Sequence, residues 1–127
     1  SESIVLNDGC GLSRTSRVTA VGLVNFLRAV RDRSYFKDLF SALPVAGRSG
    51  TLGARMAGTA AAGRVHAKTG TLDGHYQLAG YLVETEKDGP EYHPFAILTD
   101  TTASAAGYCH AVEDSVMASL ARWMLKK

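Results

Sequence analysis

One segment of the chain groups residues that can bind an anion: Val65-His66-Ala67-Lys68-Thr69-Gly70-Thr71-Leu72. The Lys68 ammonium is a fixed positive charge, the Thr69 hydroxyl supplies a short hydrogen bond, and Gly70 lets a ligand backbone come close. The N–H of Thr71 would point along a strand edge, toward a ligand carbonyl or an oxyanion. This combination of groups is suited to binding a carboxylate. Lys-Thr-Gly is short enough to occur by chance, so a surface lysine on an edge strand is the alternative from the tripeptide alone.

The residues around this segment predict the strands that must hold it. Arg64–Leu72 alternates, with Val65 and Ala67 on one face. Asp73-Gly74 is a strong two-residue hairpin signal, and His75–Glu84 follows as the return strand. A second turn at residues 87–90 leads into a third strand at Tyr92–Asp100. The expected unit is a three-strand antiparallel meander.

Helices are predicted before and after the meander in the sequence. Apolar residues at helical spacing indicate a helix over residues 19–32 with Thr19 as its N-cap, and a second helix that Ser34 caps and Pro44 ends. The C-terminal helix carries a stripe that we expect to be buried, namely Cys109, Val112, Val116, Leu120 and Trp123. Ser3–Leu6 reads as a short strand. The Gly-rich stretch 44–63 reads as a loop with one helical turn at Ala54–Ala57. The fold class is therefore α+β.

Composition narrows the functional classes. The chain has 127 residues, 46% of them apolar and 20% charged, which predicts one globular domain over 1–127 with no internal boundary. A net charge of +2 with mixed signs argues against a nucleic-acid partner. No apolar run is long enough to cross a membrane. The four histidines are scattered and no Cys-x-x-Cys occurs, so we predict no metal and no cofactor. For Cys10 and Cys109, a disulfide in an exported protein and two buried thiols remain as alternatives.

Several segments resemble one family in the right order. Lys-Thr-Gly is the third motif of the penicillin-binding proteins and class A β-lactamases. Residues 8–14, Asp-Gly-Cys-Gly-Leu-Ser-Arg, resemble the "DGSGLSR" segment of class C low-molecular-mass penicillin-binding proteins, the D-alanyl-D-alanine carboxypeptidases/endopeptidases of peptidase S13 type. Leu-Pro-Val-Ala-Gly at 43–47, Gly-Thr-Leu at 50–52 and the run 63–72 resemble that family's "LPVAG…GTL…GKVxAKTGTL". Leu-Ala-Gly-Tyr at 78–81 is similar to its "LAGY" strand.

The resemblance implies a fold, a reaction and roles for four residues. The fold would be the C-terminal part of the transpeptidase/β-lactamase-like sandwich. The reaction would be acyl transfer, in which a serine attacks the penultimate D-Ala carbonyl and water later releases the acyl-enzyme. Lys68 and Thr69 would anchor the terminal carboxylate of a peptidoglycan peptide or a β-lactam. Gly70 would clear space, and the Thr71 N–H would form half of the oxyanion hole. Action on peptidoglycan implies an exported, extracytoplasmic protein.

The chain also departs from the family pattern. Cys10 replaces the usual serine and Ser49 stands where aspartate is common. We expect the chain to lack the family's Ser-x-x-Lys and Ser-x-Asn motifs, which the family places upstream of the "DGSGLSR" segment. We therefore expect the nucleophile to lie in an upstream half of the same protein. A serine β-lactamase fragment and a non-catalytic peptidoglycan-binding module are the alternatives. A Ser-x-x-Lys motif in the upstream sequence would favour the enzyme over the binding module.

Overall fold

The computed structural model describes residues 3–101 and 105–126. In chain order the elements are β1 (Ile4–Val5), β2 (Arg17–Val18), α1 (Ala20–Arg31), α2 (Phe36–Ala42), the 3-10 turn η1 (Gly50–Leu52), β3 (Val65–Leu72), β4 (His75–Glu86), β5 (Gly89–Asp100) and α3 (Ala106–Met124). The predicted α+β class is confirmed. Within the described residues, no helix has both the length and the apolar character of a membrane span.

The main sheet is the predicted antiparallel meander, in the order β3-β4-β5. Asp73 and Gly74 form the first hairpin turn, and Gly74 takes the positive φ of 80° that such a turn requires. Lys68 pairs with Ala79 and Thr71 with Tyr76 across this hairpin. The second hairpin is longer than predicted, because β4 continues to Glu86 and β5 begins at Gly89. β1 and β2 pair separately in a small sheet, of which the sequence indicated only the first strand.

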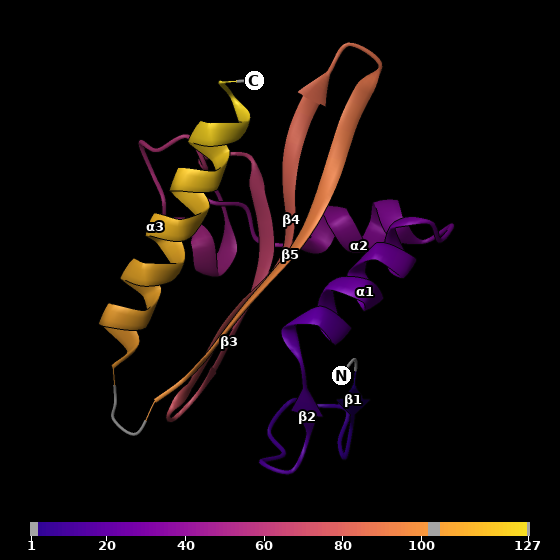
Figure 1. Ribbon diagram of the computed structural model, residues 1–127, viewed down its shortest axis with the longest axis vertical. Helices are drawn as coiled ribbons and strands as arrows, with labels where there is room; N and C mark the ends of the chain where they lie inside the picture. The colour runs from indigo at the N-terminus through magenta and orange to yellow at the C-terminus, as the bar shows by residue number, and fades with distance from the viewer. Residues whose placement is uncertain (1–2, 102–104, 127) are drawn as a thin grey trace.

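Two helical layers sandwich the meander (Figure 1). α1 and α2 lie on one face, where Phe36 packs among Tyr81, Tyr92 and Phe40. On the other face, α3 and residues 44–63 share one core with the sheet; its members include Leu52, Met56, Val65, Ala67, Leu78, Met117 and Ala121. As predicted, Val65 and Ala67 are buried on this face, while Lys68 is exposed on the other.

The helix ends test the local predictions. Thr19 caps α1 as expected, because its hydroxyl accepts a hydrogen bond from the Gly22 N–H at 3.0 Å. The prediction for Ser34 is wrong: Tyr35 is the N-cap of α2 and makes no side-chain cap bond. The helical turn predicted at residues 54–57 is also misplaced, since η1 lies at Gly50–Leu52 and Met56 takes a positive φ of 59°.

The buried face of α3 differs from the predicted stripe. Cys109 is buried as expected, but the other buried members are Glu113, Met117, Ala118, Ala121 and Met124. Val112, Val116, Leu120 and Trp123 are 40–62% exposed. Both sets satisfy helical spacing, so periodicity alone could not show which one faces the sheet. The helix therefore has an inner apolar face, which packs on the sheet, and an outer apolar face, which is exposed in the described part of the chain.

Candidate functional site

A neighbouring segment covers only the first half of the outer edge of β3. Val45 forms an antiparallel bridge with His66; the Ala46 N–H donates to the Val65 carbonyl at 2.9 Å, and the Ala67 N–H donates to the Pro44 carbonyl at 3.0 Å. Because backbone groups alternate along a strand, Thr69 and Thr71 point their N–H and C=O groups to this same outer side. The pairing ends at Ala67, so the Lys-Thr-Gly segment begins where the free edge begins.

The side chains of Lys68 and Thr69 are each held by a local contact. The Lys68 ammonium donates to the outward carbonyl of Thr69 at 2.7 Å. The Thr69 hydroxyl bonds the hydroxyl of Thr51 in η1 at 3.1 Å. A Cβ placed at Gly70 would meet the end of the Gln77 side chain, which would have to move aside. The edge thus combines a positive charge, a hydroxyl and outward backbone donors.

These residues line a cleft with the N-terminal part of the chain. The cleft has a volume of about 710 Å³, and Lys68, Thr69 and Gly70 form part of its wall. Ser13 and Arg14 of the Asp-Gly-Cys-Gly-Leu-Ser-Arg segment line the same cleft, although they precede Lys68 by more than fifty positions. The Thr71 side chain is exposed and does not line the cleft; its backbone alone belongs to the edge.

Asp8 organises the N-terminal turn, as a structural aspartate does. One carboxylate oxygen accepts from the Cys10 thiol at 3.1 Å and from the N–H groups of Leu12 and Ser13 at 2.8 and 2.9 Å. The hydrogen bond from the Cys10 thiol, with those from the backbone, lowers the pKa of Asp8. The carboxylate is therefore used in shaping the turn that carries Ser13 and Arg14 to the cleft.

The two cysteines do not form the disulfide that was one of the two sequence alternatives. Both are free thiols: Cys10 is exposed in the N-terminal turn, and Cys109 is buried in α3 against the opposite face of the sheet. Burial of both thiols, the other alternative, is correct for Cys109 only. The reason is topological, because the sheet separates the N-terminal turn from α3 (Figure 1).

Two histidines flank the Lys-Thr-Gly segment: His66 packs against a helix, and His75 lies in the wall of the cleft. His66 stacks on Phe40 with ring centroids 4.3 Å apart. Burial, together with the nearby positive charge of Arg48, lowers the pKa of His66, although a hydrogen bond to the Gly63 backbone acts in the opposite direction. His75 lines the cleft and lies 2.7 Å from the Asp100 carboxylate.

A buried ion network, which the sequence did not predict, fastens residues 44–63 to α3. The Arg55 guanidinium contacts Glu113 at 2.7 Å and Asp114 at 2.7 and 3.0 Å. Burial alone would lower the pKa of Arg55, but the hydrogen bonds and charges of Asp114 and Glu113 outweigh it and raise that pKa. The sequence signal for this network was Glu113 itself. It lies on the same face of the helix as residues spaced four positions apart, namely Cys109, Met117 and Ala121.

The chain contains one serine three residues before a lysine, Ser34 and Lys37. Both side chains are exposed at the start of α2, and neither lines the cleft with Lys68. Ser34 also follows the "DGSGLSR"-like segment, whereas the family's nucleophile precedes it. The expectation that no Ser-x-x-Lys spacing occurs in the chain is therefore wrong, but this pair does not have the place of the family's motif.

A sheet with helices on both faces and a Lys-Thr-Gly strand at its free edge is a transpeptidase-like arrangement. The chain matches the D-Ala-D-Ala carboxypeptidase 3 (S13) family over residues 1–123 and belongs to it. It is 40% identical to a D-alanyl-D-alanine carboxypeptidase of Actinomadura sp. over 126 residues, which is 94% of this chain and 22% of that protein. It is 41% identical to the carboxypeptidase DacB of Mycolicibacterium smegmatis over 85 residues, 62% of this chain and 18% of that protein.

A solved structure agrees with these sequence matches. The penicillin-binding protein 4 of Haemophilus influenzae aligns with a TM-score of 0.66 and 26% identity. The alignment covers 84% of this chain and 25% of that one. The chain thus spans a quarter or less of the relatives it matches, and it carries their fold only in part.

Proposed function

We propose that this chain is the Lys-Thr-Gly-bearing portion of a D-Ala-D-Ala carboxypeptidase/endopeptidase that acts on peptidoglycan stem peptides and is acylated by β-lactams. The observation that carries the proposal is the free edge of β3, where the Lys68 ammonium and the Thr69 hydroxyl stand beside two outward backbone donors. Membership of the S13 family supplies the reaction class. A protein that works on peptidoglycan acts outside the cytoplasm.

Each residue of the edge has a role in this reaction. The ligand carboxylate displaces the Thr69 carbonyl as the partner of Lys68 and takes a second hydrogen bond from the Thr69 hydroxyl. The outward N–H of Thr71 then donates to the carbonyl oxygen that becomes negative during attack. The serine that attacks and the lysine that accepts its proton come from the upstream part of the protein. To donate to the ligand carboxylate, the Thr69 hydroxyl turns its single proton from the Thr51 hydroxyl, to which it donates in the free chain, and Thr51 then donates to Thr69.

The test uses the full-length protein that contains this chain. It is incubated with a fluorescent penicillin and with a D-Ala-D-Ala peptide, and covalent labelling and released D-Ala are measured. Stable labelling together with D-Ala release supports the proposal. Labelling that is lost rapidly by hydrolysis, without D-Ala release, would identify a β-lactamase. Binding of the peptide with neither labelling nor release would identify a non-catalytic peptidoglycan-binding module.

A further inference from the structure

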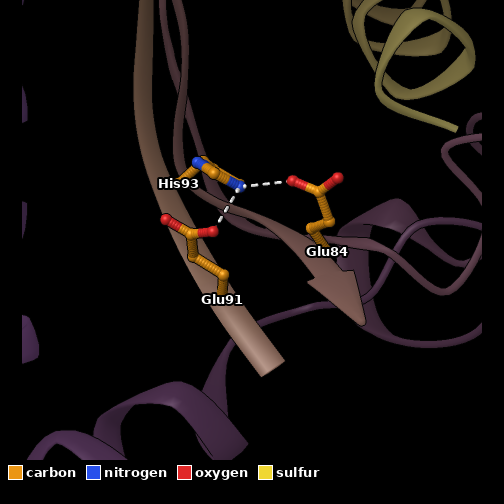
Figure 2. A group of neighbouring side chains, drawn as sticks. All are labelled: Glu84, Glu91 and His93. Atoms are coloured by element: carbon orange, nitrogen blue, oxygen red, sulfur yellow. Dashed lines mark hydrogen bonds and ion pairs between the residues drawn. The ribbon is translucent and has the colours of Figure 1, made fainter. Parts of the chain in front are cut away.

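A second cluster of ionisable side chains lies on the opposite face of the sheet from Lys68. Glu84 in β4 and Glu91 and His93 in β5 converge there, near the hairpin that joins the two strands (Figure 2). The His93 Nε2 lies 3.0 Å from Glu84 Oε2 and 3.9 Å from Glu91 Oε2. The three donor atoms all fall within 4.8 Å of one another.

Within the described residues, His93 is the partner of both carboxylates of this cluster. Glu84 and Glu91 are directly opposite each other on neighbouring strands, a placement that is destabilising for like charges. The Glu84 side chain is only 15% exposed. Among residues 3–101 and 105–126, no lysine or arginine forms an ion pair with either carboxylate; their ion-pair contacts are to His93. A cation between the two carboxylates would remove the repulsion.

The donor set and its spacing fit a zinc ion. One imidazole nitrogen and two carboxylate oxygens are all ordinary zinc ligands, whereas calcium and magnesium select oxygen alone. Zinc bonds of about 2.0–2.2 Å at tetrahedral angles place neighbouring ligand atoms roughly 3.3–3.5 Å apart. The observed 3.0 and 3.9 Å lie on either side of that spacing, so small side-chain rotations suffice.

The surroundings of the cluster also suit a bound ion. Glu84 and His93 line one wall of a cavity of about 210 Å³ between the sheet and the end of α3. The rest of its wall is mainly apolar, formed by residues such as Leu82, Phe95, Met117 and Met124. This apolar wall shields one side of the cluster from water, while the Glu91 side chain is 57% exposed on the other side, where an ion could enter.

We propose that Glu84, Glu91 and His93 bind one zinc ion, which ties β4 to β5, with water in the fourth coordination position. The site is separate from the proposed carboxylate-binding edge, because Lys68 projects from the other face of the sheet. It does not depend on the carboxypeptidase function. No single run of the sequence signals it, since the ligands come from two strands.

The test is zinc binding by the full-length protein, stripped with a chelator and titrated with zinc chloride by calorimetry. Glu84→Gln removes the negative charge of one ligand and replaces one carboxylate oxygen by an NH2 group, and His93→Gln removes the imidazole nitrogen; both nearly preserve side-chain size. Each should weaken the zinc site by at least about tenfold, since loss of even an outer-shell partner typically costs roughly 10–100-fold in metal affinity. His75→Gln is the matched control: His75 also contacts a carboxylate, that of Asp100, but belongs to no three-ligand group among the described residues.

Two further measurements keep the outcome decisive. Melting curves recorded in the presence of chelator show whether each variant folds. If Glu84→Gln does not fold, Glu91→Gln replaces it as the carboxylate variant, because Glu91 is more exposed. Cobalt substituted for zinc should show the visible absorption of a low-coordinate ion in the wild type, and that absorption should be lost in His93→Gln. Absence of zinc binding by the wild type, or equal binding by wild type and His93→Gln, would overturn the proposal. A His75→Gln variant that lost the site would overturn it as well.

Discussion

Lys68 supplies the one fixed charge of the proposed substrate edge, and its ammonium is already directed at the outward carbonyl of Thr69. We predict that Lys68→Ala in the full-length protein slows acylation by a β-lactam. The lost charged hydrogen bond corresponds to about 1.5–3 kcal/mol, roughly a ten- to hundredfold drop in rate. Stopped-flow or gel-based acylation rates measure it. An Ala variant that acylates at the wild-type rate would remove Lys68 from the site.

Lys68→Arg distinguishes charge from geometry at the same position. The guanidinium keeps the charge but is larger and planar, and it cannot occupy the place of a compact ammonium. We expect it to recover little of the acylation rate. Full recovery would mean that Lys68 acts through charge alone, without the directed hydrogen bond.

His66 gives the stability of the protein a dependence on pH. Burial lowers its pKa below the ordinary value of 6.5, so the unfolded chain binds a proton before the folded one does as the pH falls. Its contribution to stability is complete above that value and is lost progressively as the pH drops toward the folded-state pKa. We predict that the melting temperature of His66→Gln falls less than that of the wild type between about pH 7.5 and 5.5. Equal falls would contradict the assignment.

The residues that sequence reasoning identified are those with local chemistry. Lys-Thr-Gly can be recognised because its three residues are adjacent in the sequence and form one motif. Thr51 could not be assigned a role, since its contact with Thr69 exists only after residues 44–63 fold back along β3. The zinc cluster was missed for the same reason: its ligands meet across a strand register.

Residues 44–63 have no regular secondary structure beyond η1, and Arg55 forms their ion pairs with α3. We predict that Arg55→Met destabilises the protein by about 3–5 kcal/mol, because Glu113 is left as an unpaired buried charge. Urea unfolding of the full-length protein measures the change. Arg28→Met on the exposed side of α1 is the matched control. Its free energy of unfolding should stay within about 0.5 kcal/mol of the wild-type value.

A double variant separates the charge from the packing. Replacing both Arg55 and Glu113 by Met removes the unpaired charge, so much of the lost stability should return. If the double variant is as unstable as Arg55→Met, the network stabilises by shape and not by charge pairing.

The strands and helices were predicted well where one pattern dominated. The meander was predicted from the alternation of apolar and polar residues and from the Asp73-Gly74 turn. α1 was predicted from apolar residues at helical spacing and from Thr19 as the N-cap. α3 was placed correctly along the chain but turned to the wrong face, because it is apolar on two sides and only the sheet decides between them. Gly-rich residues 44–63 combine short-range turn hydrogen bonds with contacts to β3 and α3, and those distant contacts leave no local signal in the sequence.

At the scale of the molecule, the chain leaves surfaces that a self-sufficient fold would cover. Val112, Val116 and Leu120 are 40–44% exposed on the outer face of α3. β5 is an edge strand whose Tyr92 carbonyl is met by the Arg31 side chain. We predict that the isolated 127-residue chain is not labelled by fluorescent penicillin and self-associates. Gel fluorescence and size-exclusion chromatography test the two parts.

Labelling by penicillin and self-association test two different properties of the isolated chain. A labelled 13.5 kDa band would show that the chain carries its own nucleophile. A monodisperse monomer that unfolds cooperatively would show that these surfaces need no partner. Addition of the upstream half, expressed as a second chain, should restore both labelling and solubility.

The bridge between Val45 and His66 has a consequence for which peptides can be cut. In the proposed orientation, a ligand lies antiparallel to β3 with its carboxylate at Lys68 and Thr69 and its reacting carbonyl at Thr71. Two outward positions on β3, those of Thr69 and Thr71, then remain before the ligand reaches Pro44, whose carbonyl pairs with the Ala67 N–H. In that orientation the Pro44–Ala46 segment would stop the ligand just beyond its carboxylate, so the residue after the bond that is cut would need a free carboxylate. Selectivity for the last residue of a peptide would reside in this backbone barrier and not in a side-chain pocket.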